Sequence, residues 1–190
     1  MSNFEFVFSL LAIILGLGLA QVLGGLASAA KRRPGLKIGW GTGLLATWVT
    51  TETVIFWEII WRARDVLPND SVALFPGVAV TALYYFAAAL VFPDDLDRRA
   101  SLDDYFMREK AKAIGAILAA LALAFAWRRA AMGPDAWAAI PWYAWASMAI
   151  IYVAGPAAIL TRRRGIAIAA LTVLVVTDLL DPIESILWPG

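Results

Sequence analysis

Six long apolar segments, separated by short charged or proline-containing stretches, dominate the pattern of hydrophobic and polar positions along the chain. Each segment has about 20 residues or more, the length of helix that crosses a hydrocarbon core roughly 30 Å thick. The pattern therefore predicts an all-α integral membrane protein, a six-helix transmembrane bundle with short loops that forms a single transmembrane domain over residues 1–190. The expected spans are about 4–30, 40–61, 72–92, 111–130, 137–160 and 165–188.

One sizeable polar stretch, residues 94–112, interrupts this pattern. Ser101 stands three residues before Asp104, a spacing typical of a capped helix start. We expect an amphipathic cytoplasmic helix extension near residues 101–112 that runs straight into the fourth span. That span is short and rich in Ala, so we expect it to occupy the centre of the bundle.

Proline positions modify the last two spans. Gly155-Pro156 predicts a kink at the far end of the fifth span, because a proline in a helix removes one backbone hydrogen bond and clashes with the preceding turn. Pro182 predicts a kink or an end in the sixth span.

Composition supports the membrane assignment and excludes one class of partner. The chain is 62% hydrophobic with a mean hydropathy of +0.74, whereas roughly half of the residues in soluble domains are apolar. The net charge is +1, and the basic residues are scattered among short loops. No basic face is available to neutralise a line of phosphates, so nucleic acid is not an expected partner.

The absence of Cys and His from the sequence excludes disulfides, thiolate nucleophiles, Cys/His zinc sites and His-ligated haem. The lysines are Lys31, Lys37, Lys110 and Lys112, which we expect at helix ends or in loops. A buried amine for a Schiff base is therefore also not expected. No cofactor and no metal site is predicted, and because no complete catalytic set is present we do not expect an enzyme.

The distribution of basic residues predicts the orientation. Twelve Lys and Arg residues flank the first, third and fifth loops, whereas four flank the second and fourth. Basic loops remain in the cytoplasm, so both termini are expected on the non-cytoplasmic side of a bacterial-type inner (plasma) membrane. Six tryptophans fall near the expected outer interface, as aromatic belts do. They are Trp57, Trp61, Trp127, Trp137, Trp142 and Trp188.

A ladder of small residues runs along the first span. Gly16, Ala20, Gly24 and Ser28 recur at every fourth position. Such spacing lets a second helix approach closely, so we interpret the ladder as a helix-packing face. The expected partners are the lipid bilayer and either other membrane subunits or a second copy of the chain.

Acidic residues inside the apolar segments are the strongest candidates for chemistry. Asp178, Asp181 and Glu184 lie in the sixth span and Glu52 lies near the middle of the second. Each costs about 2.5–3.5 kcal/mol at mid-bilayer, so the acids are expected to face inward. Glu52 is twelve residues beyond Trp40 and Asp178 thirteen beyond residue 165. At ~1.5 Å per residue the two lie at the same depth and can meet.

Depth separates the remaining acids from this pair. Asp181 and Glu184 lie nearer the outer surface, on either side of Pro182. For Glu184 we favour the interpretation that it lies in the interface between membrane and water. Glu52, Asp178 and Asp181 form the candidate proton or cation site.

Two functions remain open at this stage. One is a non-enzymatic accessory subunit that packs within a larger or oligomeric membrane assembly. The alternative is a small proton- or cation-coupled transporter or channel that uses Glu52 and Asp178, with Asp181 as gate or relay. Convergence of Glu52 and Asp178 beside an outward-open cavity favours transport, whereas separate capping of each acid in a solid bundle favours the subunit.

Overall fold

The computed structural model describes residues 3–32, 39–64, 71–94, 101–132 and 140–187, and these form six helices and no strand. The helices are α1 (Asn3–Arg32), α2 (Trp40–Arg62), α3 (Ser71–Ala89), α4 (Leu102–Met132), α5 (Trp142–Leu160) and α6 (Arg164–Leu187). Four stretches are long and apolar enough to cross a membrane, and α3 contains a shorter apolar stretch. The four are Glu5–Lys31, Trp40–Arg62, Leu102–Ala131 and Trp142–Leu160. The chain is therefore an all-helical protein suited to a membrane.

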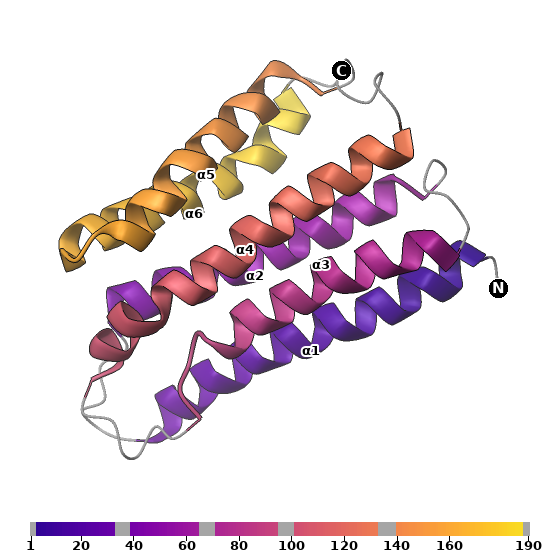
Figure 1. Cartoon of the computed structure of the whole chain (residues 1–190). Coiled ribbons are helices and arrows are strands. Elements are labelled where there is room, and N and C mark those ends of the chain that lie inside the picture. Colours follow the sequence, from indigo (N-terminus) through magenta and orange to yellow (C-terminus); the bar gives the residue numbers. More distant parts are fainter. Residues whose placement is uncertain (1–2, 33–38, 65–70, 95–100, 133–139, 188–190) are drawn as a thin grey trace.

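The helices lie side by side in three pairs. In Figure 1, α1 and α3 form one side of the bundle, α2 and α4 the middle, and α5 and α6 the other side. α4 contacts α2, α3 and α5, and α2 contacts α1, α3, α4 and α6. The expected central position of the fourth span is therefore shared with α2, the helix that carries Glu52.

The packing of α1 against α3 follows a heptad-like spacing of buried positions. The residues turned toward the bundle are Leu11, Leu15, Gly18, Val22 and Ala29. The two helices run in the same direction (Figure 1). A Cβ at Gly18 would lie 3.6 Å from the Cα of Tyr85, and one at Gly25 would lie 2.4 Å from the ring of Phe92. Small residues on this face let the helices approach closely.

The ladder of small residues on α1 faces away from the rest of the chain. No atom of another described segment lies within 4 Å of a Cβ placed at Gly16 or Gly24. Ala20 is exposed and Ser28 is half-buried. The ladder is therefore not the surface that α1 uses to pack within the bundle, and its role in contact with another chain stays a prediction.

One end of the bundle carries Lys31, Lys110 and Arg162–Arg164, and we call it the basic end. The expectation that no lysine is buried is wrong, because Lys110 is only 3% exposed. Its Nζ donates hydrogen bonds to the carbonyl oxygens of Ala158, Ile159 (3.1 Å) and Thr161 (2.9 Å). All three donors of the ammonium group are thus used to cap the carboxyl end of α5, where a positive charge is stabilised.

Further contacts join α4 to its neighbours at the basic end. The backbone N–H of Asp104 donates to the Ser101 hydroxyl over 3.4 Å, so Ser101 caps α4 as its spacing indicates. Arg164 forms an ion pair with Asp103, and Thr42 donates to the carbonyl of Leu102 at 3.2 Å. α4 then continues without a break to Met132, so the polar extension and the apolar span are one helix.

The last two helices continue through their prolines. α5 begins at Trp142, directly after Pro141, whereas residues 133–139 lie outside the described residues. It continues past Pro156 to Leu160, and α6 continues past Pro182 to Leu187. Pro182 therefore does not end the last helix.

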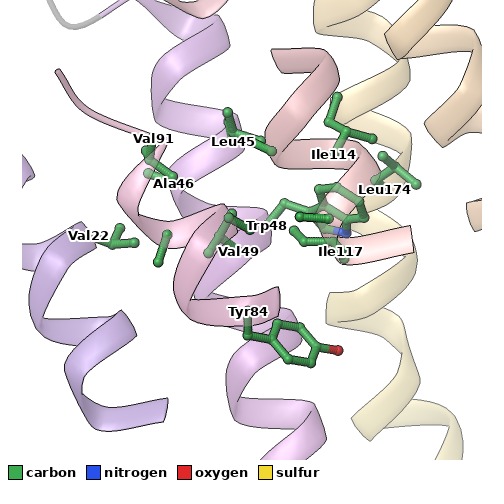
Figure 2. Close-up of a cluster of buried hydrophobic side chains, with 14 of the residues drawn as sticks. Val22, Leu45, Ala46, Trp48, Val49, Tyr84, Val91, Ile114, Ile117 and Leu174 are labelled. Atoms are coloured by element: carbon green, nitrogen blue, oxygen red, sulfur yellow. The ribbon is translucent and has the colours of Figure 1, made fainter. Parts of the chain in front are cut away.

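The tryptophans divide between the surface and the core. Trp57, Trp61 and Trp142 are 38%, 50% and 70% exposed. Trp137 and Trp188 lie outside the described residues. Trp48, by contrast, is completely buried in the middle of the bundle, where Figure 2 shows it beside Ile117 and Leu174.

Candidate functional site

The middle of the bundle contains two carboxylates in an otherwise apolar core. Glu52 on α2 is 2% exposed and Asp178 on α6 is 3% exposed. α2 and α6 pack against each other and run in the same direction (Figure 1). Trp48 and Leu174, each one turn before its acid, are also fully buried. The residues at i and i+4 lie on the same helix face, so each acid lies on a face directed into the core.

Tyr84 on α3 is a hydrogen-bond partner of Glu52. Its hydroxyl donates a hydrogen bond to Oε2 of Glu52 at 3.2 Å. The same phenol, which is 1% exposed, lies within electrostatic range of Asp178. Figure 2 shows the hydroxyl directed toward α6. The phenol is therefore bonded to Glu52 and is influenced by the charge of Asp178.

Tyr152 brings a fourth helix, α5, to the same cluster. It interacts electrostatically with both Glu52 and Tyr84, and its hydroxyl donates to the carbonyl of Leu118 at 3.5 Å. Because Tyr152 is 39% exposed, it connects the cluster to the surface of the bundle. We call Glu52, Tyr84, Tyr152 and Asp178 the carboxylate cluster.

Aromatic side chains close the carboxylate cluster along α2. Phe56, one turn beyond Glu52, packs its ring 5.2 Å from the ring of Tyr84. Trp48, one turn before Glu52, is the largest fully buried side chain. The three residues share one face of α2 because they are spaced by four. Glu52 is thus flanked by a buried aromatic side chain one turn away on either side.

The threonines around the cluster bond to their own helices. The Thr53 hydroxyl donates to the carbonyl of Val49 at 2.7 Å, and that of Thr177 donates to Val173 at 2.9 Å. Their hydroxyl hydrogens are therefore not directed at the carboxylates. This bonding pattern is common for Thr inside a helix.

The other acids predicted from the sequence are not part of this arrangement. Glu58 forms an ion pair with Arg62 at 2.5 Å, at the exposed surface of α2. The backbones of Asp181 and Glu184 belong to α6, but their side chains lie outside the described residues. Within the described residues, His, Cys, Asp and Glu form no group of three or more that is suited to hold a metal ion.

The cluster suits the binding of a positive charge. Two carboxylates buried together in a medium of low dielectric constant are costly, and a bound proton or cation lowers this cost. The phenol of Tyr84 supplies a hydrogen-bond donor to Glu52 when that carboxylate is ionised.

Sequence reasoning identified both acids but missed the groups around them. Tyr84 was recognisable only as part of an aromatic patch with Tyr85 and Phe86. Tyr152 and Trp48 carry no local signal, because an aromatic residue in an apolar segment is ordinary. Trp48 does stand four residues before Glu52, and that spacing places the two side chains on one helix face.

Comparisons of the chain with protein families, with curated proteins and with solved structures give no match.

Proposed function

We propose that this protein is a small proton- or cation-coupled transporter or channel whose central site is formed by Glu52 and Asp178. The observation that carries the proposal is the burial of two carboxylates, Glu52 and Asp178, on the packed helices α2 and α6, with the buried phenol of Tyr84 bonded to Glu52. Ionisable groups inside membrane segments are rare because they are costly, and they mark ion or proton pathways.

The position of the cluster supports this function. Glu52 and Asp178 come from different helices in the centre of the bundle, where transporters place their coupling sites. Asp181 follows Asp178 by one helical turn and is proposed as a gate or relay toward the carboxyl end of α6. The buried rings of Trp48 and Phe56, one turn before and one turn after Glu52, are consistent with a site closed to water along α2.

The proposed setting is a bacterial-type inner membrane crossed six times, with both termini outside the cytoplasm. Its support is the excess of basic residues in alternate loops, which the positive-inside rule places in the cytoplasm. In this orientation the basic end of the bundle faces the cytoplasm.

Reconstitution into proteoliposomes tests the proposal. Under an imposed pH gradient and a counter-ion pathway, the wild-type protein is expected to carry a proton or cation flux above that of empty vesicles. Glu52→Gln and Asp178→Asn are each expected to reduce the flux on the order of a hundredfold, the effect of removing a positioned proton-transfer group. Glu58→Gln, which changes an exposed acid on the same helix, is the matched control and retains the flux. Flux that survives in the double variant Glu52→Gln/Asp178→Asn overturns the proposal.

A second function is favoured by a different observation. The ladder Gly16, Ala20, Gly24 and Ser28 faces away from the bundle, so it is available to another membrane chain. We therefore retain the proposal of a non-enzymatic accessory subunit in a larger or oligomeric assembly. Copurification from native membranes tests it: loss of a partner, or of a second copy, upon Gly24→Leu supports this function, and a monomer without partners contradicts it.

A further inference from the structure

The buried indole of Trp48 presents a hydrogen-bond donor that no described residue accepts. Its side chain is completely buried, and among the described residues the Nε1–H group has no acceptor. Figure 2 shows the ring between Ile117 and Leu174. The indole nitrogen is on the lower edge of the ring in this view, and Tyr84 is drawn further down. Trp48 lies one turn from Glu52 on the same buried face of α2, so the two residues point into the same part of the core.

The cluster also has few oxygen ligands for a metal ion. α2 and α6 continue as helices through Glu52 and Asp178, so their backbone carbonyls at this level are engaged in helical hydrogen bonds. Sodium sites in transporters use carbonyls of unwound helices, and Ca²⁺ takes about 6–8 oxygen ligands. Two carboxylates and a phenol fall short of such a set, and no group of three acids is present within the described residues.

The hydroxyl of Tyr84 and the N–H of Trp48 are instead suited to stabilise an ionised carboxylate. The hydroxyl of Tyr84 already donates to Glu52. An indole N–H can only donate, so the group that satisfies it must be an acceptor such as a carboxylate oxygen, reached directly or through one water molecule. A metal cation is repelled by an N–H donor, whereas an ionised carboxylate is stabilised by it.

We propose that the ion bound at the carboxylate cluster is a proton and not a metal cation, and that Trp48 and Tyr84 stabilise the carboxylate when the proton leaves. This inference rests on the proposed transport function and names its ion. On release, the O–H bond of the protonated carboxyl of Glu52 or Asp178 breaks, and the electron pair stays on the carboxylate. The proton passes to the other carboxylate or to water. Uptake reverses these steps.

Infrared difference spectroscopy of the whole protein in lipid tests the binding without requiring transport. A carbonyl band of a protonated carboxyl, assigned by its loss in Glu52→Gln or Asp178→Asn, is expected to titrate with pH. At fixed pH and ionic strength, replacing choline with Na⁺, K⁺ or Ca²⁺ is expected to leave the band unchanged. A change with any of these cations, or a band that does not titrate, overturns the inference.

Trp48→Phe tests the role of the indole donor. This change removes the N–H group while keeping an aromatic side chain, so the ionised form loses one donor. The proton is then expected to bind about tenfold more tightly, the effect of one hydrogen bond to a charged acceptor, and the band persists to higher pH. Trp57→Phe, on an exposed face of α2, is the control and leaves the titration unchanged. A titration that is identical in Trp48→Phe and wild type overturns the role of Trp48.

Flux measurements separate this inference from the proposed function. Proton flux that is independent of Na⁺ and K⁺ supports both proposals. Flux of Na⁺ or K⁺ through wild type that is lost in Glu52→Gln supports transport and overturns the choice of a proton. A titrating band without flux of any ion contradicts transport while the assignment of the bound proton stands.

Discussion

At the residue scale, the buried ionisable side chains of Glu52 and Lys110 have partners on other helices. Glu52 accepts from Tyr84 on α3, and Lys110 on α4 donates to three carbonyls at the end of α5. Every donor of Lys110 is engaged, as in a structural cap. We therefore assign a structural role to Lys110, whereas a functional role is proposed for the acids.

Tyr84→Phe tests the hydrogen bond to Glu52. Removing the hydroxyl takes away a donor beside both carboxylates, so proton flux in proteoliposomes is expected to fall about tenfold, as for the loss of one hydrogen bond to a charged group. Tyr85→Phe, at the adjacent and exposed position on α3, is the matched control and retains the flux. Equal fluxes for the two variants contradict a role of Tyr84 in the site.

Lys110→Met tests the cap on α5. The change leaves carbonyls at Ala158, Ile159 and Thr161 without their donor, and the free energy of unfolding is expected to fall by about 3 kcal/mol. The thermal unfolding midpoint in detergent measures the effect. Lys112→Met removes an exposed ion pair with Glu109 and should cost about 0–1 kcal/mol. Similar midpoints for both variants would show that the cap contributes no stability.

At the scale of elements, α1 has two faces rich in small residues with different surroundings. Gly18 faces α3 and Gly25 faces Phe92, which follows α3, whereas a Cβ at Gly16 or Gly24 has no neighbour within 4 Å among the described residues. The small residues of each face favour close helix packing. Only the contacts with Tyr85, Ala88 and Phe92 distinguish the face that is used inside the chain.

Gly25→Ala and Gly24→Ala form a matched pair on this helix. A Cβ at Gly25 meets the ring of Phe92 at 2.4 Å, so the variant is expected to lose about 1–3 kcal/mol of stability through overpacking. Gly24→Ala meets no atom within 4 Å and is expected to be neutral or to gain up to about 1 kcal/mol from helix propensity. The thermal unfolding midpoints of both variants in detergent measure these changes in stability. A greater loss for Gly24→Ala than for Gly25→Ala would contradict the packing described for α1.

At the scale of the whole molecule, three pairs of helices enclose the carboxylate cluster with basic residues at one end. The central pair, α2 and α4, contributes Glu52 and the capping Lys110. The outer pairs contribute Tyr84, Tyr152 and Asp178. The site is thus assembled from all three pairs, and a change in how they pack alters access to it.

Cysteine labelling tests the proposed orientation in the membrane. The chain contains no Cys, so Arg163→Cys and Glu58→Cys each introduce a single thiol at an exposed position. A membrane-impermeant maleimide added to intact spheroplasts is expected to label Glu58→Cys and to label Arg163→Cys only after permeabilisation, because the basic loop lies in the cytoplasm. The opposite result would place both termini inside.

The sequence by itself determined the helical class, the apolar segments and the depth of the acids. These follow from local quantities: hydropathy sets which stretches cross a membrane, and the rise per residue sets the level of Glu52 and Asp178. The helix start at Ser101 and the Glu58–Arg62 pair were also readable, because their partners lie within one turn.

Only the tertiary structure decided which partners those groups meet. Glu52 is separated from Tyr84 by 32 residues, and Lys110 from its carbonyl acceptors by about 50. Such contacts depend on the rotation and order of whole helices, and an apolar segment does not encode these locally. For the same reason only the structure showed that the small-residue ladder of α1 faces outward among the described residues and that the indole N–H of Trp48 is buried without an acceptor there.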